Sequence, residues 1–260
     1  MSRVAVVTGA ARGIGAATVR RMVADDWLVV AVDRGSDDPR LPYPLGTAEE
    51  LAAVAEAGGD RVIAMLADTT DPDGLAAAVA RAESEFGGLD AMVAAAGVIA
   101  GGVPLWEMPD HEIASVLGVN LGGVINAARV SIPALLRQPS PRSGRFLAVA
   151  SAAASRGLPM LAAYGAAKAG VAGLIRGLAV ELGNSGVTAN AVSPGSTDTA
   201  LLEESARIYG LESTAAFTHH QPIGRLLGAD EVAAAIVWLA GNDSSGLTGA
   251  VVPVDGGLAL

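Results

Sequence analysis

The sequence lacks cysteine and is poor in aromatic residues and in histidine. Its 260 residues include no Cys and only 3 His, and aromatic residues make up 3% of the chain. The absence of cysteine excludes disulfides, thiolate metal sites and a cysteine nucleophile. Two of the histidines, His219 and His220, are adjacent, a spacing that cannot place two zinc ligands on one helix face. We therefore expect these residues and His111 to be loop histidines, and we expect no metal site.

Positive charge and long apolar runs are also scarce. Lys and Arg number 17 against 27 Asp and Glu, for a formal net charge of −10, and no basic run marks a nucleic-acid partner. Although 51% of the residues are hydrophobic, no window holds the roughly 18 uninterrupted apolar residues of a membrane span. The apolar run at Val4 follows Met1 too closely to leave room for a secretory leader. These absences predict a soluble, cytoplasmic protein without a membrane anchor.

Short apolar runs alternate with longer helical patterns along the chain. Seven strand-like runs cover residues 4–7, 28–32, 61–66, 89–95, 145–150, 187–192 and 250–254. Helical patterns lie after the first run and at about 72–86, 109–137, 161–183 and 229–240, and Thr47 with Glu50 forms a capping box for another helix. This alternation predicts one doubly wound α/β domain over residues 1–260, with a seven-stranded parallel sheet covered by helices on both faces.

A glycine-rich turn joins the first predicted strand to the first predicted helix. It reads Thr8-Gly9-Ala10-Ala11-Arg12-Gly13-Ile14-Gly15. Glycines allow the backbone to approach a pyrophosphate closely, and the N-terminus of the next helix directs its N–H groups at the phosphates. A glycine cluster can also be a purely structural turn. Its place between strand and helix favours nucleotide binding by Gly9, Arg12, Gly13, Ile14 and Gly15.

Acidic residues end the second and third predicted strands. Asp33 stands where a carboxylate would bind the adenosine ribose hydroxyls, and it would repel a 2′-phosphate, which favours NAD over NADP. Arg12 and Arg34 could approach the same region and weaken that preference, although we expect Arg34 to be a solvated surface charge. Asp68 or the Thr69 amide either contacts the adenine or belongs to the cap of the next helix.

Tyr164 and Lys168 lie four positions apart on a predicted helix and therefore face the same side. A nearby ammonium favours the phenolate and lowers the pKa of a tyrosine, as a general acid/base requires. Ser151 follows the fifth predicted strand, 13 positions before Tyr164, and its hydroxyl could polarise a carbonyl oxygen. A Tyr-x-x-x-Lys spacing on its own often occurs by chance. Together with the glycine turn and Asp33 it indicates hydride transfer between NAD(H) and an alcohol/carbonyl pair.

With these motifs the chain resembles the short-chain dehydrogenase/reductase family over essentially its whole length. The matching stretches are Thr8–Gly15, Asp68, Ala94–Gly97, Asn120, Ser151, Tyr164-x-x-x-Lys168, Pro194-Gly195 and Val254–Gly257. The resemblance implies that Ser151, Tyr164 and Lys168 form a catalytic triad and that Asn120 completes a proton relay through a water. Asn120 would otherwise be expected to cap or kink its helix.

The resemblance also implies the remaining cofactor contacts. Pro194-Gly195 through Thr199 would line the nicotinamide amide side, with Thr197 and Thr199 as contacts, and Ala96 and Gly97 would border the cofactor. The family's usual Asn-Asn-Ala-Gly is Ala94-Ala95-Ala96-Gly97 here, and the missing asparagine would remove structural hydrogen bonds from the centre of the sheet.

The loop over residues 34–46 is longer than in most members of the family. It contains Leu41-Pro42-Tyr43-Pro44-Leu45 and is similar to an insertion in a subgroup associated with the redox carrier mycofactocin, which includes carveol-dehydrogenase-like enzymes. There the insertion is thought to cover the adenosine end and retain NAD. The alternative is a surface loop stiffened by prolines.

Residues 196–227 occupy the place of the family's variable substrate lid. Their apolar side chains, Leu201, Leu202, Ile208, Tyr209, Leu211 and Phe217, favour a hydrophobic alcohol or ketone, or simply pack the lid on the body. The resemblance further implies a homotetramer formed by the helices at 109–137 and 161–183. Two other functions stay open: an NADP(H)-dependent 3-oxoacyl-thioester reductase, which Asp33 disfavours, and a non-catalytic NAD-binding regulator.

Overall fold

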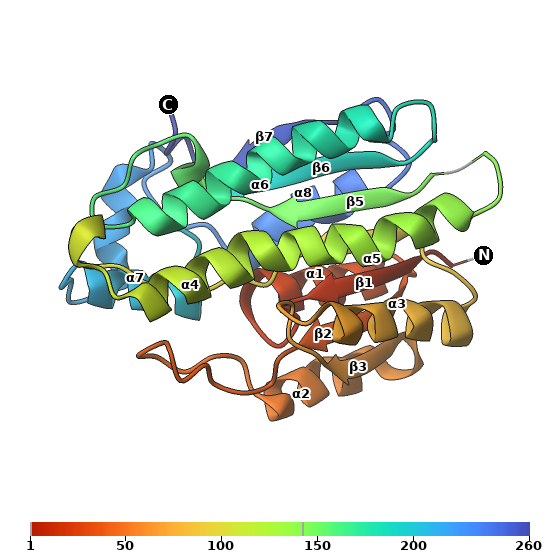
Figure 1. Cartoon of the computed structure of the whole chain (residues 1–260), viewed down its shortest axis with the longest axis horizontal. Helices are drawn as coiled ribbons and strands as arrows, with labels where there is room; N and C mark the ends of the chain where they lie inside the picture. Colours follow the sequence, from red (N-terminus) through yellow and green to blue (C-terminus); the bar gives the residue numbers. More distant parts are fainter. Residues whose placement is uncertain (1, 142) are drawn as a thin grey trace.

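The computed structural model describes residues 2–141 and 143–260, and a parallel seven-stranded sheet organises them (Figure 1). The strand order is β3-β2-β1-β4-β5-β6-β7. The strands are β1 (Val4–Thr8), β2 (Leu28–Asp33), β3 (Val62–Leu66), β4 (Ala91–Ala94), β5 (Arg145–Val149), β6 (Thr188–Pro194) and β7 (Val251–Val254). The predicted doubly wound fold is confirmed.

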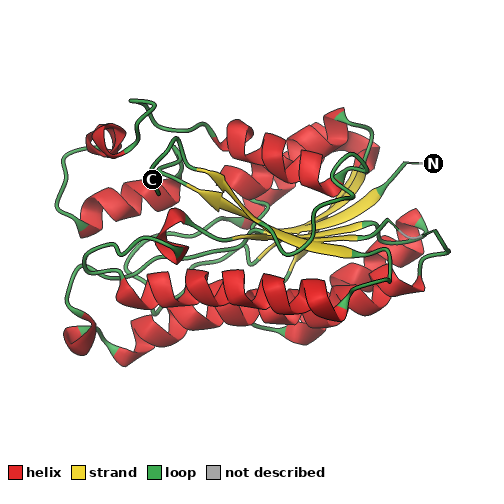
Figure 2. Cartoon of the chain, turned by 90° about the horizontal axis from the view of Figure 1, so that it is seen from above, coloured by secondary structure: helices red, strands yellow, loops and turns green. Residues whose placement is uncertain are grey.

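Helices cover both faces of this sheet (Figure 2). They are α1 (Gly13–Ala24), α2 (Ala48–Gly58), α3 (Pro72–Phe86), α4 (Asp110–Leu117), α5 (Gly123–Arg137), α6 (Ala162–Glu181), α7 (Ala200–Ile208) and α8 (Ala229–Ala240). One buried cluster joins α3, α5 and α6 to the sheet, and a second joins α1, α2 and α8 to its other face. Because the strands are buried on both sides, β1, β4 and β5 are apolar almost throughout.

Local sequence explains where several helices begin. Thr47 Oγ1 accepts a hydrogen bond from Glu50 N (3.1 Å) and Glu50 accepts one from Thr47 N (2.8 Å), which is the predicted capping box at the start of α2. The long helix predicted over 109–137 is interrupted: a π-helical turn, Gly118–Gly122, separates α4 from α5. Such turns place an extra residue in a helix and often mark functional sites.

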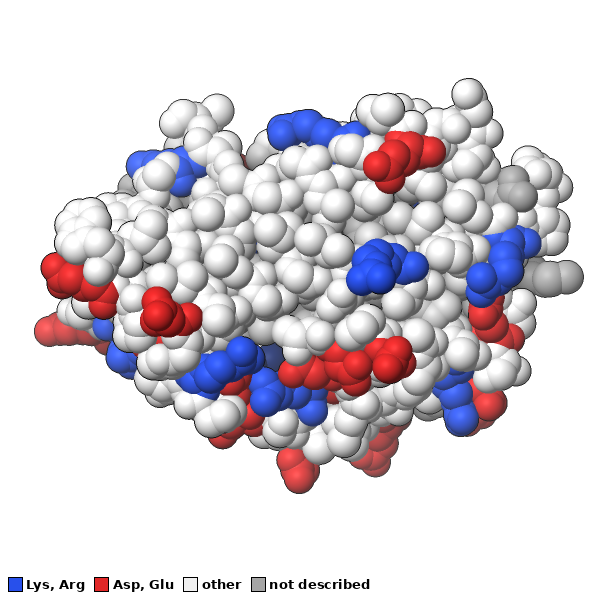
Figure 3. Space-filling model, viewed as in Figure 1, with Lys and Arg blue, Asp and Glu red and all other residues white. Residues whose placement is uncertain are grey.

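The helix that runs from Asp110 to Arg137 is apolar on its outer side as well as its inner side. By length and hydropathy this helix is compatible with a membrane span. Its most apolar stretch of 18 residues has a mean hydropathy of 1.4, and 39% of that stretch is buried in the fold. It lies against the sheet beside α6 (Figure 1), as a core helix of a soluble protein does. The face of the molecule over α4, α5 and α6 carries few charges (Figure 3).

The register aligns the carboxyl ends of the strands at one edge of the sheet. Thr8 in β1 pairs with Val32 in β2 and with Ala94 in β4. The chain order reverses between β1 and β4, because β2 and β3 lie on one side of β1 and β4 to β7 on the other. In open α/β sheets ligands bind in the crevice at this reversal.

Candidate active site

A cavity of about 710 Å³ opens at the carboxyl edge of the sheet. The turn after β1, the ends of β2 and β4, the loop over 34–46, the N-terminal part of α6 and the lid segment all contribute to its wall. Every residue of the predicted site lines this cavity except Asn120, which lies directly behind Gly97.

The glycine turn is shaped by close backbone contacts. Gly9 has φ +68°, and a Cβ there would lie 2.7 Å from Ala96 Cα; a Cβ on Gly15 would lie 2.0 Å from the Gly9 carbonyl oxygen. Helix α1 begins at Gly13 with no acidic residue in its first turn and no side-chain cap from Arg12. Its first N–H groups are therefore available to an anion, as phosphate binding requires.

Thr8 supports the segment after β4. Its Oγ1 accepts hydrogen bonds from Ala95 N (3.1 Å) and Ala96 N (3.2 Å). The expected loss of hydrogen bonding at the Ala94–Gly97 stretch is thus offset by a residue of the neighbouring strand. A Cβ on Gly97 would lie 3.0 Å from Asn120 Oδ1 and 3.6 Å from Lys168 Nζ, so glycine at this position leaves room for both side chains behind the segment after β4.

Asp33 ends β2 at the wall of the cavity. Its carboxylate accepts hydrogen bonds from Ala11 N (3.0 Å) and Gly35 N (3.3 Å), which fixes it beside the glycine turn. The prediction that Arg34 is a solvated charge is wrong. Its side chain is 29% exposed and pairs with Asp38 at 3.3 Å and Asp68 at 3.6 Å, because the loop over 34–46 folds back and buries Asp38.

Asp68 and Thr69 lie on the turn after β3. Asp68 Oδ1 accepts hydrogen bonds from the backbone N and the hydroxyl of Thr70, both at 2.8 Å. The cap of α3 is Asp71, whose carboxylate accepts from Asp73 N (3.0 Å). Asp68 therefore shapes the turn and pairs with Arg34, while Thr69 is buried at the cavity wall.

The loop over 34–46 is anchored at several points. Arg12 Nη2 donates to the Pro44 carbonyl oxygen (2.7 Å), and the Tyr43 hydroxyl accepts from Ile99 N (2.9 Å). Leu41 is buried in an apolar cluster that also contains Tyr164. Asp38 is buried and accepts hydrogen bonds from Arg40 and from Ser115 on α4. The loop is consequently packed on the body and forms part of the cavity wall.

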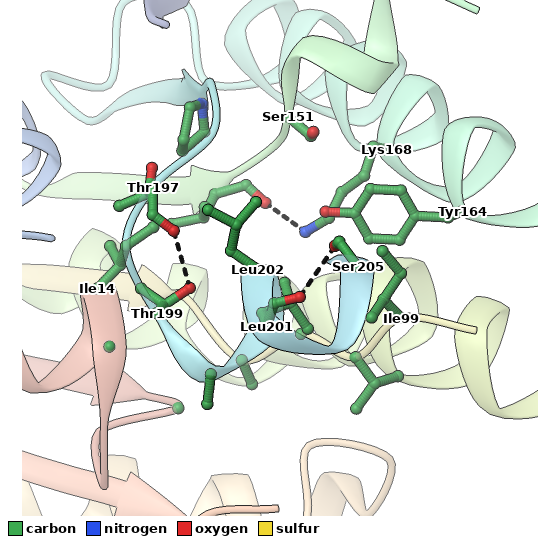
Figure 4. Close-up of a pocket in the computed structure, with 18 of the residues that line it drawn as sticks. Ile14, Ile99, Ser151, Tyr164, Lys168, Thr197, Thr199, Leu201, Leu202 and Ser205 are labelled. Atoms are coloured by element: carbon green, nitrogen blue, oxygen red, sulfur yellow. Dashed lines mark hydrogen bonds between the residues drawn. The ribbon is translucent and has the colours of Figure 1, made fainter. Parts of the chain in front are cut away.

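Ser151, Tyr164 and Lys168 gather at the middle of the cavity (Figure 4). Ser151 follows β5, and its Oγ accepts from Ala153 N (3.1 Å). Tyr164 and Lys168 occupy one buried face of α6, with Lys168 Nζ 5.7 Å from the centroid of the Tyr164 ring. Nζ also donates to the Val149 carbonyl oxygen (2.8 Å).

Burial sets the protonation of this group. Burial raises the pKa of Tyr164, and a hydrogen bond with the Ser151 side chain acts in the opposite direction. Burial lowers the pKa of Lys168 to about 8. Without a further positive charge, Tyr164 is therefore a protonated acid at neutral pH, ready to donate to a carbonyl oxygen.

Asn120 lies in the π-helical turn and is fully buried. Its Nδ2 donates to the carbonyl oxygens of Val98 (2.8 Å) and Val116 (2.9 Å), and its Oδ1 accepts from Val98 N (3.2 Å). The side chain thus joins the distorted helix to the segment after β4. Asn120 therefore stabilises the distortion of its helix, as the alternative to the relay expected, while the relay itself stays a prediction.

The segment after β6 completes the wall. A Cβ on Gly195 would lie 2.6 Å from the Asp255 carbonyl oxygen, so only glycine fits behind Pro194. Thr197 Oγ1 donates to the Gly195 carbonyl oxygen (3.1 Å), and Thr199 Oγ1 donates to that of Thr197 (3.2 Å; Figure 4).

Sequence reasoning missed several residues at the lid end. Buried Gln221 holds Ser196, accepting from its N–H (2.9 Å) and donating to its carbonyl oxygen (3.2 Å). Arg156 and Leu258 line the cavity. The histidine prediction is wrong in part, because His111 lies in the first turn of α4 and His220 ends a 3₁₀ segment and lines the cavity. Hydrophobic periodicity could not reveal these contacts, since each depends on a distant part of the chain.

No cluster of three or more His, Cys, Asp or Glu side chains able to hold a metal occurs among residues 2–141 and 143–260. The acidic groups near the cavity instead pair with Arg34 and Arg40 or accept backbone N–H groups.

Comparison with known proteins places this site in a family. A family model described as Enoyl-(Acyl carrier protein) reductase matches residues 9–259. Cis-4-hydroxycyclohexanecarboxylate dehydrogenase of Sinomonas cyclohexanicum is 39% identical over 98% of this chain and 96% of its own length. (−)-trans-Carveol dehydrogenase of Rhodococcus erythropolis is 34% identical over 99% and 98%.

A solved structure agrees with these relatives. Carveol dehydrogenase from Mycobacterium avium, in complex with NAD, has a TM-score of 0.92 and 30% identity, covering 98% of this chain and 97% of its own. The agreement extends over nearly the whole length of both chains. The protein belongs to the short-chain dehydrogenase/reductase family of oxidoreductases.

Proposed function

We propose that this protein is an NAD(H)-dependent dehydrogenase/ketone reductase that acts on a secondary alcohol of hydrophobic character. One observation carries the proposal: Ser151, Tyr164 and Lys168 lie together at the centre of a cavity. The glycine turn and Asp33 line one end of the same cavity. General acid/base groups and a nucleotide cradle thereby face the same space.

The residues at the glycine-turn end fit NAD. The backbone at Gly9 and Gly15 leaves no room for a side chain, and the first turn of α1 is free to bind a pyrophosphate. The Asp33 carboxylate suits ribose hydroxyls and repels the 2′-phosphate of NADP. Arg12 and Arg34 already contact Pro44, Asp38 and Asp68, which supports a preference for NAD.

The chemistry follows from the central residues. When bound, NAD supplies the hydride acceptor. During oxidation the phenolate form of Tyr164 takes the hydroxyl proton of the alcohol, and during reduction its protonated form donates a proton to the carbonyl oxygen. Ser151 donates a hydrogen bond to that oxygen. The Lys168 ammonium stabilises the phenolate and holds the nicotinamide ribose, and Asn120 supports a water that passes the proton to solvent.

The lid end favours a hydrophobic, cyclic alcohol. Leu201, Leu202 and Tyr209 line the cavity next to the central hydroxyls. The relatives named above act on carveol and on hydroxycyclohexanecarboxylate, both alcohols on six-membered rings.

The loop over 34–46 suggests how electrons leave the enzyme. Its contacts through Pro44, Tyr43 and Leu41 support retention of NAD between turnovers, with mycofactocin as the external electron acceptor. Gel filtration tests this: retained NAD and dependence on an artificial acceptor support it, whereas free exchange with added NAD would assign the protein to the ordinary exchanging enzymes.

The weakly charged face over α4, α5 and α6 suits a subunit interface (Figure 3). Leu117 and Ile125 expose 39% and 37% of their surface, and Val180 exposes 83%. Burial of such a face in a cytoplasmic homotetramer would remove apolar surface from water. Light scattering at several concentrations distinguishes a tetramer from a monomer.

Replacement of Tyr164 tests the proposal most directly. Tyr164→Phe keeps the ring and removes the hydroxyl, so alcohol oxidation should fall by a factor on the order of 10²–10⁴ while NAD binding persists. Undiminished turnover would remove Tyr164 from its role. Wild-type protein that binds NAD but turns over no alcohol would be a regulator, and tighter binding of NADP than NAD would favour a thioester reductase.

A further inference from the structure

The lid end of the cavity differs in charge from the glycine-turn end. Three carboxylates and two guanidinium groups line the glycine-turn end: Asp33, Asp38, Asp68, Arg12 and Arg34. Beyond the central lysine, the lid end is lined mainly by leucines and aromatic rings. Its one charged side chain among residues 2–141 and 143–260 is Arg156, and its one imidazole is that of His220.

Arg156 lies on the short loop between Ser151 and α6. Its backbone N donates to the Ala152 carbonyl oxygen (3.0 Å), and its Nη1 donates to the Leu258 carbonyl oxygen. Leu258 also lines the cavity, so this contact fixes Arg156, an exposed residue, at the rim of the cavity. Within the described part of the chain no carboxylate lies within ion-pairing distance of it.

His220 reaches the same end of the cavity from the lid. It ends the 3₁₀ segment Thr214–His220, and its ring packs edge-on against Phe217 at 6.1 Å between centroids. Phe217 in turn packs against Tyr209 at 6.2 Å. These aromatic contacts orient the imidazole of His220, an exposed residue, and place a second hydrogen-bond donor at a wall lined mainly by apolar side chains.

An unpaired guanidinium at an apolar wall implies an anionic ligand group. A guanidinium offers five N–H donors in a planar fork, of which the protein uses one here. Because Arg156 is exposed, its guanidinium is open to water, and an uncharged ligand that covered it would displace this water without replacing the hydrogen bonds. A carboxylate would satisfy both the charge and the geometry, and the local cation would offset the repulsion expected from a net charge of −10.

We propose that the alcohol substrate is a hydroxy acid, with a carboxylate separated from the carbinol carbon by an apolar ring. Arg156 binds the carboxylate, His220 donates a second hydrogen bond, and the ring lies against the leucines of the lid with its hydroxyl at Tyr164. This assignment rests on the proposed function and specifies its substrate class. Arg156 is thereby a specificity-determining residue and takes no part in proton or hydride transfer.

Paired substrates test the assignment. The probes are cis-4-hydroxycyclohexanecarboxylate and its methyl ester, which share the ring and hydroxyl and differ in charge. Wild-type protein should favour the acid, and Arg156→Met should reduce the acid/ester ratio of kcat/KM by about ten- to a hundredfold, mainly through KM, because the lost contact is remote from the reacting carbon. Arg61→Met, an exposed arginine paired with Asp26 outside the cavity, should leave the ratio unchanged.

A binding measurement removes the dependence on turnover. Calorimetry of the NAD-loaded protein with cyclohexanecarboxylate and with cyclohexanecarboxamide should show tighter binding of the acid, and Arg156→Met should abolish the difference while its thermal unfolding stays close to wild type. Equal binding of acid and amide by wild-type protein would overturn the assignment. Selective binding of the acid without hydride transfer would support the carboxylate site and contradict the proposed dehydrogenase activity.

Discussion

The two ends of the cavity are built by different means. At the glycine-turn end the shape is made by the backbone: Gly9 and Gly15 lie against other backbone atoms, and Asp33 is fixed by two N–H groups. At the lid end the wall is made by side chains such as Leu202 and Phe217, with few hydrogen bonds between them. The first end can therefore accept one shape of ligand, and the second can change its ligand by single substitutions.

The largest effect on ligand binding is expected where an added side chain would collide with the backbone of the glycine turn. Gly15→Ala would place a Cβ 2.0 Å from the Gly9 carbonyl oxygen, so the turn must open and NAD affinity should fall at least about a hundredfold. Gly246→Ala is the matched control, because a Cβ there meets no atom within 4 Å. Titration of both variants with NAD checks the difference. Near-normal affinity in Gly15→Ala would show that the backbone at this end is adaptable.

A smaller effect is expected from the charge at the base of the loop over 34–46. Hydrogen bonds from Arg40 and Ser115 hold the pKa of the Asp38 carboxyl well below its usual range. Because the folded-state pKa is depressed, this stabilisation is complete above the unfolded pKa and is lost as pH falls below about 4.

Asp38→Asn should therefore reduce the free energy of unfolding by about 2 kcal/mol at pH 7, with a difference that shrinks toward pH 3. Denaturant titration at several pH values measures it. Asp25→Asn, on the exposed turn after α1, provides the control. A difference that stays constant with pH would mean that the Asp38 charge does not support the loop.

The smallest effects are expected from removing a single tyrosine hydroxyl at each end of the cavity. Tyr43→Phe removes the acceptor of Ile99 N (2.9 Å) and should speed NAD release about fivefold, since a lost hydrogen bond costs about 1 kcal/mol. Tyr209→Phe removes the donor to the Pro159 carbonyl oxygen (2.8 Å) and should raise KM for the alcohol by a similar factor. Stopped-flow release and steady-state kinetics measure both. Identical effects of the two variants on NAD release would erase the distinction between the ends.

The sequence was sufficient for the sheet and for the centre of the cavity. Strands and helices follow from hydrophobic periodicity, and Tyr164 and Lys168 lie on one helix face because four positions make a helical turn. The side chains of the loop and lid could not be predicted in this way. Asp38 is buried because Ser115 and Arg40 meet it, and Arg156 lines the site because Leu258 lies beside it. Such contacts join distant positions and leave no periodic signal.

The π-helical turn at Gly118–Gly122 has a consequence for how this chain tolerates change in length. A single extra residue in a helix rotates everything after it by about 100°. The wider π turn absorbs its extra residue, so deletion of one residue here would restore regular winding and leave Val124 and Ala127 of α5 facing the core, where both are now buried. The cost of that deletion would instead fall on Asn120, whose hydrogen bonds to Val98 and Val116 depend on this turn.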